Sequence, residues 1–223
     1  MQKLDVAIID YKISNMFSVK SACKFFGLNV DIVNGREQIL NARAAILPGV
    51  GTFSAGMYHL KELQLEEVIS EFISSGKPFM GICLGMQLLM SDSEEFGYHK
   101  GLDLIKGSVK KLPLMNEKSE KIRIPNIGWE KISIKKQGDD NIWPKSAVKD
   151  IPDDELMYFV HSFFVTPTDT QIVTTETNYE GFKFCSSIAF QNIFASQFHP
   201  EKSGKVGLTI FRNFSEAVRG TVD

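Results

Sequence analysis

Short apolar runs alternate with segments of helical spacing along the first 90 residues of the chain. Strands that are apolar along their whole length are typical of a parallel sheet with helices on both faces. The alternation therefore predicts an α/β fold with a mostly parallel sheet and helices on both of its faces. The predicted strands span residues 6–9, 28–33, 44–47 and 78–83, and the predicted helices span residues 16–26, 65–73 and 84–90.

Beyond Gly101 the pattern changes, because strand-like pieces are now joined by turn-rich segments. This pattern predicts antiparallel hairpins added to the parallel core. The pieces lie at residues 108–112, 131–135, 157–165, 172–177, 182–190 and 193–198. Residues 136–155 are rich in turn-forming residue types and are predicted to form the most exposed loop, and residues 207–218 are predicted to form a closing helix.

Length, charge and cysteine usage limit the class of protein. A chain of 223 residues is expected to form one domain over residues 1–223. The net charge of −2 gives no electrostatic reason to expect a nucleic acid or a membrane as partner. No apolar run approaches the roughly 18 residues of a membrane span, and the N-terminus lacks the layout of a signal peptide. A cytoplasmic protein is therefore expected.

The three cysteines are an odd number and lack the Cys-x-x-Cys spacing of a metal site. This argues against a disulfide framework or a zinc site and fits a reducing compartment. Cys23 lies in a helical pattern and Cys185 in an alternating one, so both are predicted to be packing residues. Cys83 has different surroundings.

Cys83 lies between two glycines, in Gly-Ile-Cys-Leu-Gly at 81–85, where a predicted strand meets a predicted helix. A nucleophile at such a sharp turn needs small neighbours, because side chains on the flanking residues would clash with the crowded backbone. The turn directs backbone N–H groups toward the group under attack, and a helix N-terminus favours the thiolate form of a cysteine. The motif predicts a nucleophile, and a buried cysteine beside two turn glycines is the alternative.

A second motif, Gln-Phe-His-Pro-Glu-Lys-Ser at 197–203, follows an apolar run at 193–196. A cysteine nucleophile needs a base, and the base needs a carboxylate or amide to hold its tautomer. His199 and Glu201 supply these two groups, and residues two apart in an extended segment face the same side. A loop histidine near a solvated glutamate is the alternative for this motif alone.

Several of these features fall at the carboxyl ends of predicted parallel strands, where ligands bind in open α/β sheets. They are residues 10–15, Pro-Gly-Val-Gly at 48–51, and Cys83. His199 follows a later strand and is expected to reach the same edge. The sequence therefore predicts one active site assembled from remote segments.

Together these motifs resemble the class I (triad) glutamine amidotransferases, over nearly the whole chain. Within that class the chain is similar to the glutaminase subunits of imidazole glycerol phosphate synthase. The narrower resemblance rests on residues 10–15, on Pro-Gly-Val-Gly-Thr-Phe at 48–53, on residues 124–129 and on Tyr-Phe-Val-His-Ser at 158–162. The resemblance implies the class I glutaminase fold, which is a flavodoxin-like, mostly parallel sheet with added antiparallel hairpins.

The resemblance implies a glutaminase with a Cys-His-Glu triad and without a metal or other cofactor. Cys83 would attack the carboxamide carbon of glutamine, and His199, oriented by Glu201, would act as base and then protonate the departing ammonia. The N–H of Leu84 and an N–H from Val50 or Gly51 would stabilise the oxyanion. The alternative for residues 48–51 is a simple tight turn. Family behaviour also suggests that this oxyanion strand is inactive until the synthase binds its substrate.

The resemblance also implies how glutamine is held. Gln87 and Glu95 would recognise its amino-acid end, with Glu95 pairing the ammonium, and the backbone at Ser162 and Phe163 would contribute. From the residues alone, Glu95 is expected to be a solvated acid and His161 a satisfied core histidine.

A separate synthase subunit is expected, because free ammonia would be protonated and lost in water. The resemblance implies a heterodimer with a (β/α)8-barrel cyclase, whose products are imidazole glycerol phosphate for histidine synthesis and aminoimidazole carboxamide ribotide for purine synthesis. Asn15 and Trp129 match positions that face the cyclase. A buried core position is the alternative for Trp129.

The chain departs from this family at one motif, since residues 125–130 read Pro-Asn-Ile-Gly-Trp-Glu where Pro-His-Met-Gly-Trp-Asn is usual. These positions are expected at the edge that faces the partner and not in the triad, so the departure concerns the partner. A paralogous glutaminase subunit that feeds another synthase, such as one amidating a bacterial surface sugar, therefore stays an alternative. A stand-alone γ-glutamyl hydrolase and a non-catalytic binding subunit are further alternatives.

Overall fold

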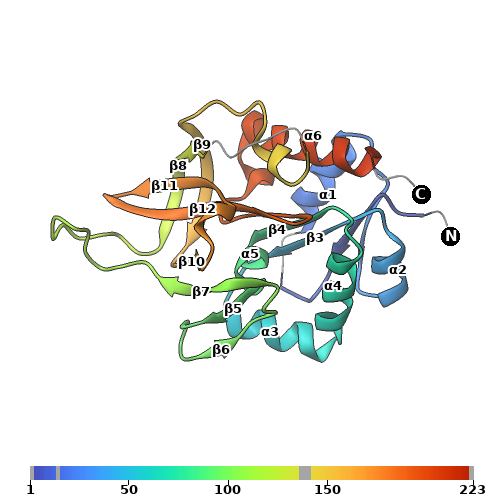
Figure 1. Ribbon diagram of the computed structural model, residues 1–223, viewed down its shortest axis with the longest axis horizontal. Helices are drawn as coiled ribbons and strands as arrows, with labels where there is room; N and C mark the ends of the chain where they lie inside the picture. The colour runs from blue at the N-terminus through green and yellow to red at the C-terminus, as the bar shows by residue number, and fades with distance from the viewer. Residues whose placement is uncertain (1–2, 14–15, 136–141, 221–223) are drawn as a thin grey trace.

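The computed structural model describes residues 3–13, 16–135 and 142–220, which form a nine-stranded sheet and a smaller sheet with helices around them (Figure 1). One part of the large sheet is parallel. Its strands, in spatial order, are β2 (Val30–Val33), β1 (Val6–Ile9), β3 (Ala44–Gly49), β4 (Phe79–Cys83) and β13 (Ile193–Ser196). This is the flavodoxin-like strand order, with β13 as the fifth strand.

The other part of the large sheet is antiparallel and continues from β13. It consists of β12 (Phe182–Phe190), β11 (Val173–Tyr179), β8 (Asn126–Ile134) and β9 (Glu155–His161). The smaller sheet has the order β10 (Phe163–Pro167), β7 (Ile105–Lys111), β5 (Met90–Ser93) and β6 (His99–Lys100). The predicted α/β fold with added antiparallel strands is therefore confirmed.

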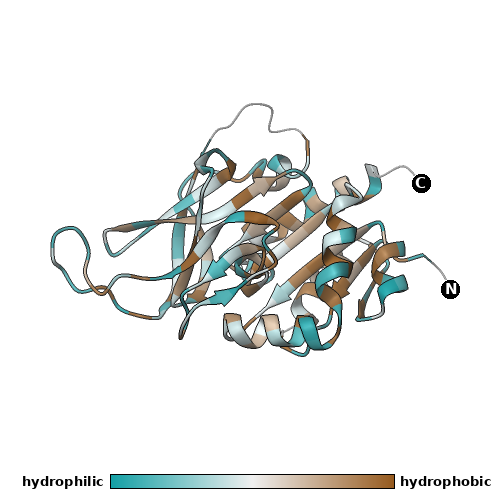
Figure 2. Ribbon diagram, turned by 60° about the horizontal axis from the view of Figure 1, so that its bottom comes forward, coloured by the Kyte–Doolittle hydropathy of each residue, from teal (hydrophilic) through white to brown (hydrophobic). Residues whose placement is uncertain are grey.

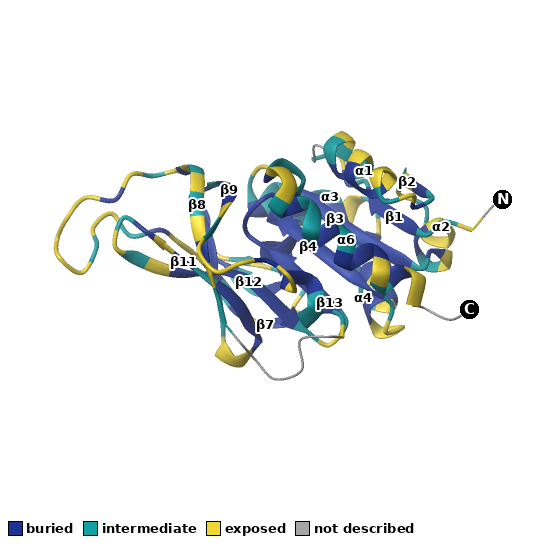
Figure 3. Ribbon diagram, turned by 90° about the horizontal axis from the view of Figure 1, so that it is seen from above, coloured by how far each residue is buried: buried dark blue, intermediate teal, exposed yellow. Residues whose placement is uncertain are grey.

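Helices cover the parallel part of the sheet on both faces (Figure 3). One face carries α1 (Met16–Phe25) and α6 (Gly204–Gly220), and the other carries α2 (Arg36–Asn41), α3 (Phe53–Glu62), α4 (Leu65–Ser74) and α5 (Leu84–Leu88). Alternate residues of β1 pack into different layers: Ala7 and Ile9 join the core under α4, and Val6 and Ile8 join the core under α6. The central strands β1 and β3 are accordingly apolar and buried along their length (Figure 2).

Several predicted elements have different boundaries in the structure, and the backbone hydrogen bonds explain two of these differences. The predicted helix at 84–90 is shorter, because the carbonyl of Leu88 accepts from Leu102 and that of Leu89 from Ile105 instead of from a further helical turn. The predicted strand at 157–165 is two strands in different sheets, β9 and β10. The chain changes sheets at Ser162, whose carbonyl accepts the N–H of Leu112.

The prediction of an exposed loop at 136–155 holds for Lys149, Asp150 and residues 152–154, and it is wrong for the residues around Ala147, which are buried or partly buried. Residues 136–141 lie outside the described residues. A 3-10 turn, η1 (Lys145–Val148), buries Ala147 against the core. Asn213 of α6 donates to the carbonyls of Ala147 and Lys149, which fastens this segment to the helix. Other short 3-10 turns are η2 (Thr170–Ile172) and η3 (Pro200–Lys202).

Cys23 and Cys185 are buried, as predicted for packing residues. None of the helices in the described ranges combines the length and the apolar character that crossing a membrane requires.

The contact between η1 and α6 gives a stability test. The fully buried Phe214 ring lies 5.1 Å from the ring of Trp143, centroid to centroid. We expect Phe214→Ala to lower the free energy of unfolding by about 3–5 kcal/mol, because it removes a large core side chain and leaves a cavity. Phe25→Ala, at a ring that is 72% exposed, is the control and should change it by less than about 1 kcal/mol. Urea unfolding measures both, and equal losses would contradict this view of the core.

Candidate active site

Cys83 is the last residue of β4 and lies directly before α5. Its backbone has φ 53° and ψ −109°, which is unfavourable for a residue with a side chain and costs on the order of 1–3 kcal/mol. The turn is tight, since a Cβ on Gly85 would lie 1.8 Å from the carbonyl oxygen of Leu47 in β3. A Cβ on Gly81 would lie 3.1 Å from the Ala195 side chain. The two glycines thus permit the sharp strand-to-helix turn that the sequence predicted.

His199 and Glu201 follow β13, the strand next to β4, and their side chains are in contact. Nδ1 of His199 lies 2.8 Å from Oε1 of Glu201, and both side chains are 3% exposed. Because an ionised carboxylate only accepts hydrogen bonds, Nδ1 carries the proton. In the neutral ring Nε2 then holds a free lone pair on the side of the Cys83 sulfur. This is the state that a general base requires.

The electrostatics of His199 depend on Cys83 and Glu201. Burial alone would lower the pKa of His199, but the nearby Cys83 sulfur and the Glu201 carboxylate outweigh burial and raise that pKa above 6.5, its ordinary value. The raised pKa favours the protonated imidazole, which can donate a proton to a leaving group.

The segment that carries His199 is fastened to β9. The N–H of His199 donates to the carbonyl of Tyr158 at 2.9 Å. The hydroxyl of Ser203 donates to the carbonyl of His199 at 2.7 Å and accepts the N–H of Tyr158 at 2.9 Å. The histidine is therefore fixed by strands on both sides of the junction between the parallel and antiparallel parts.

A cavity of about 490 Å³ opens beside Cys83. Most of the residues expected from the sequence line it, namely Val50, Gly51, Cys83, Leu84, Gln87, Glu95, Ser162 and Phe163, and so do His161 and Lys202. Asn15 lies outside the described residues. His199 and Glu201 do not line this cavity, since both are buried, and His199 lies next to Cys83. Trp129 is 51% exposed on β8, so the alternative of a buried core position is wrong for it.

Glu95 is not the solvated acid that its surroundings in the sequence suggest, since it is only 7% exposed. Its Oε2 accepts the N–H of Phe53, the first residue of α3, at 2.6 Å. Burial raises the pKa of Glu95, and the hydrogen bond from Phe53 and the nearby His99 partly offset this effect. A buried carboxyl at a cavity wall is suited to pairing with a cation.

Some of the backbone groups that were expected to bind the substrate already form hydrogen bonds with other residues of the protein. The N–H of Val50 donates to the carbonyl of Ile13 at 3.2 Å, so in this conformation it is not available to an oxyanion. The carbonyl of Ser162 accepts from Leu112, and that of Phe163 accepts from Gln87 and from His161.

His161 is a buried and hydrogen-bonded side chain, in keeping with the expectation of a satisfied core histidine. Its Nδ1 donates to the carbonyl of Phe163 at 2.9 Å, and the amide of Asn126 lies 3.3 Å from its Nε2. Burial lowers the pKa of His161 to about 4, so the ring is neutral at physiological pH.

Of the residues at 125–130 that differ from the usual family motif, only some lie at the surface. Asn126 is fully buried against His161, so the expectation that it lies at the edge facing a partner is wrong, because strand alternation turns it inward. Ile127 is 60% exposed and points the other way, on the same strand as Trp129.

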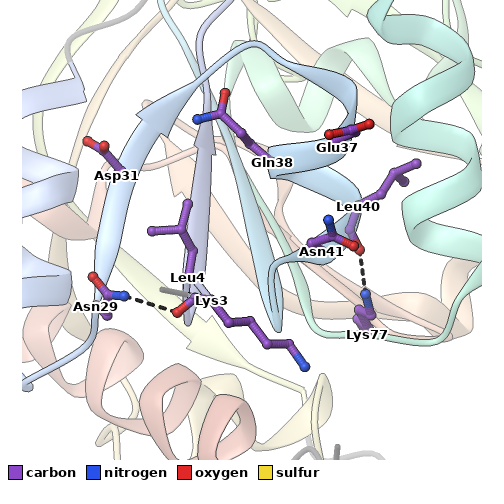
Figure 4. Close-up of a pocket in the computed structure, with 9 residues that line it drawn as sticks. All are labelled: Lys3, Leu4, Asn29, Asp31, Glu37, Gln38, Leu40, Asn41 and Lys77. Atoms are coloured by element: carbon purple, nitrogen blue, oxygen red, sulfur yellow. Dashed lines mark hydrogen bonds between the residues drawn. The ribbon is translucent and has the colours of Figure 1, made fainter. Parts of the chain in front are cut away.

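Another hollow lies at the opposite ends of the strands (Figure 4). It is lined by residues such as Leu4 before β1, Asn29 before β2 and Lys77 before β4. Lys77 donates to the carbonyl of Leu40 at 2.7 Å, so this cation already stabilises the end of α2. The cavity beside Cys83 is the better candidate for catalysis, since the triad and the carboxyl ends of the strands meet there.

Comparison with known proteins agrees with this assignment of the site. The family model "Glutamine amidotransferase class-I" matches residues 7–217. The chain belongs to this family of glutamine amidotransferases.

Similar sequences support the same family. The chain is 43% identical over 209 residues to the imidazole glycerol phosphate synthase subunit HisH 1 of Legionella pneumophila, covering 94% of this chain and 97% of that one. It is 40% identical over 211 residues to the HisH subunit of Geobacter metallireducens, with coverage of 94% and 97%. The resemblance inferred from the motifs is confirmed.

The fold is shared with more distant amidotransferases. A crystal structure of a glutamine amidotransferase from Thermotoga maritima has a TM-score of 0.68 at 14% identity and covers 99% of this chain and 100% of that one. Another glutamine amidotransferase structure has a TM-score of 0.70 at 16% identity, with coverage of 96% and 98%.

Sequence reasoning assigned no role to two buried side chains next to the triad of this amidotransferase. The hydroxyl of Tyr11 is buried, and a Cβ on Gly49 would lie 2.0 Å from it. The amide of Gln197 contacts the sulfur of Cys83 at 3.6 Å. Gln197 stands in the His-Pro-Glu motif, which was a signal for it, whereas no local pattern distinguishes Tyr11.

The close contact at Gly85 gives a test of the turn. We expect Gly85→Ala to lower the free energy of unfolding by about 3 kcal/mol and to abolish glutaminase activity, because its Cβ overlaps the Leu47 carbonyl. Gly220→Ala in α6 meets no atom within 4 Å and should leave stability within about 1 kcal/mol. Urea unfolding and glutamate release measure the two effects, and a stable, active Gly85→Ala variant would disprove the assignment.

The pairing of His199 with Glu201 predicts a pH dependence of stability. A histidine whose pKa is raised on folding stabilises the protein fully below pH 6.5, and this contribution is lost as the pH rises through the raised value. We therefore expect the stability lost on Glu201→Gln to be larger at about pH 6 than at about pH 9, because the variant removes one cause of the raised pKa.

Urea unfolding at the two pH values measures this difference. The same substitution in a His199→Gln background is the control, and there the pH-dependent part should disappear. A loss that is equal at both pH values would show that Glu201 does not act through the protonated histidine.

Proposed function

We propose that this glutamine amidotransferase is the glutaminase subunit of an imidazole glycerol phosphate synthase, which hydrolyses glutamine to glutamate and passes the ammonia to a synthase partner. The observation that carries the proposal is the contact of His199 with both Glu201 and Cys83, where Cys83 lines a cavity, in a chain that is 43% identical to a HisH subunit over 94% of its length.

The geometry supports the following role for each catalytic residue. The Cys83 thiolate attacks the carboxamide carbon of glutamine, and His199 donates its Nε2 proton to the departing ammonia. The resulting γ-glutamyl thioester is hydrolysed by a water molecule that His199 deprotonates, which releases glutamate and restores the thiol. Glu201 holds the Nδ1–H tautomer and stabilises the imidazolium in both steps.

The cavity has groups for the amino-acid end of glutamine. Glu95 is placed to pair with the substrate ammonium, because a buried carboxylate gains most from a cation that also fills the site. Gln87, Ser162 and Phe163 line the same cavity. Since the carbonyl of Phe163 already accepts two hydrogen bonds, Phe163 would bind the substrate through another group, whereas the carbonyl of Ser162 accepts only one and can accept a second.

The oxyanion site is proposed to be completed only in the complex. Leu84 is the first residue of α5, and the first N–H groups of a helix have no acceptor within the helix. The second donor, from Val50 or Gly51, requires a change of the strand, because Val50 is bonded to Ile13. A glutaminase with this conformation is expected to be slow until its partner binds.

The partner is proposed to be a (β/α)8-barrel cyclase in a heterodimer with this chain, itself one domain over residues 1–223. The exposed Ile127 and Trp129 on β8 provide an apolar surface near the cavity, since Pro125 on the same segment lines it. Asn15 is proposed for the same interface by resemblance. A cytoplasmic location is proposed because the three cysteines are unpaired.

The deciding experiment measures glutamate release from glutamine, first by this protein alone and then with the barrel cyclase of the same organism and its ribulosyl nucleotide substrate. We expect a strong rise only when both are added. Cys83→Ala should abolish glutamine-dependent product formation and leave ammonia-dependent synthesis by the partner intact.

Other outcomes identify the alternatives. No rise, from a Cys83 that reacts with a glutamine-like electrophile, would favour a paralogue that serves another synthase. Full activity without a partner would favour a stand-alone γ-glutamyl hydrolase. A Cys83 without such reactivity would favour a non-catalytic subunit, and loss of ammonia-dependent synthesis in Cys83→Ala would make the cysteine structural.

A further inference from the structure

A chain of hydrogen-bonded side-chain amides connects Cys83 to the wall of the cavity. Nε2 of Gln197 donates to Sγ of Cys83 at 3.6 Å, within the normal range for a sulfur acceptor. Oε1 of Gln197 accepts from Nε2 of Gln87 at 3.0 Å. Nε2 of Gln87 also donates to the backbone carbonyl of Phe163 at 2.9 Å.

The donor-to-acceptor direction of these hydrogen bonds follows from the Phe163 carbonyl. A carbonyl oxygen only accepts, so the Gln87 atom beside it must be the nitrogen. The Gln197 atom beside that nitrogen must then be the oxygen, because two amide nitrogens would present donor to donor. The remaining amide nitrogen of Gln197 therefore points at the sulfur, and a flipped amide would break both of its contacts.

Gln197 is held rigidly in this position. It is fully buried at the end of β13, and its N–H donates to the carbonyl of Ser186 in β12 at 2.9 Å. Its amide thus loses no mobility when the nucleophile forms, which is the condition for an effective preorganised donor. His199 reaches the same sulfur from two residues further along the chain.

We propose that Gln197 is a positioning residue, which fixes the sulfur of Cys83 by donating a hydrogen bond to it and is itself held by Gln87. The inference rests on the proposed role of Cys83 as the nucleophile. An N–H donor stabilises an ionised sulfur more than a neutral thiol, because the acceptor carries charge. Together with His199, it constrains the sulfur from two sides.

Other ionisable groups surround Cys83 and remain in place when Gln197 is changed. His199 contacts the sulfur electrostatically, with Glu201 behind it. The buried Tyr11 lies close enough that burial and Cys83 both raise its pKa. Glu95, His161 and Lys202 line the same cavity. A change caused by Gln197→Met therefore reports the lost donor, because this side chain is similar in length and carries no charge.

The test is the rate of Cys83 alkylation by iodoacetamide as a function of pH in the isolated chain, with Cys83→Ala as the blank for Cys23 and Cys185. We expect Gln197→Met to raise the midpoint of the pH profile by about one pH unit, which lowers the rate near neutral pH about tenfold. Gln197→Glu should raise it further, because it removes the donor and adds a negative charge. In the activated complex, kcat should fall more than KM changes.

Asn213→Leu is the matched control for loss of a buried amide. Asn213 of α6 donates to the carbonyls of Ala147 in η1 and of Lys149 directly after it, so its loss should lower stability and leave the alkylation midpoint unchanged. Gln87→Met, which removes the group that holds Gln197, should raise the midpoint by a smaller amount. It also serves as the test if Gln197→Met does not fold.

An unchanged midpoint in the Gln197 variants, or in Gln87→Met where these do not fold, would overturn the inference. The proposed function would be refuted by another result, namely that Cys83 in the unmodified protein is alkylated no faster than an ordinary thiol. In that case the Gln197 variants would have no enhanced reactivity to lose.

Discussion

The close approach of Gly85 to the carbonyl of Leu47 is the contact on which the active site depends. It allows α5 to start directly at the end of β4, against β3, which forces the backbone of Cys83 to a positive φ. The strain is sustained because β4 is fully buried between two parallel neighbours, so the turn cannot relax without breaking the sheet. The sulfur is thereby placed between the end of β3, which Val50 follows, and the end of β13, after which His199 lies.

A second constraint is that one backbone carbonyl, which can only accept hydrogen bonds, fixes the orientation of the side chains that donate to it. Phe163 accepts from both Gln87 and His161, and neither contact permits a reversed orientation. The contact with Gln87 fixes the orientation of the two side-chain amides, Gln87 and Gln197, that lead to Cys83. The other fixes the tautomer of His161, so that its Nε2 accepts from Asn126. A chain that has asparagine at 126 therefore retains a bonded histidine, and the departure from the family motif is accommodated within the core.

The segment between β3 and α3 links the substrate cavity to the part of the chain where the oxyanion donors are expected. Glu95 accepts the N–H of Phe53, and Val50 donates to Ile13. A substrate ammonium at Glu95 would act on the start of α3, only a few residues from Val50. The same short segment is thus positioned to respond both to substrate and to a partner docked over the carboxyl ends of the strands.

Sequence alone determined the alternation of buried strands and helices, the parallel core and the identity of Cys83, His199 and Glu201, because these follow from local patterns of residue type and spacing. It did not reveal α2, which has only six residues, or α3, or the change of sheet at Ser162 within a continuous apolar run. Only the tertiary structure decided that Glu95 and Asn126 are buried and that Gln197 meets Cys83. Burial and amide direction depend on which distant backbone groups lie opposite a side chain, and no local pattern contains that information.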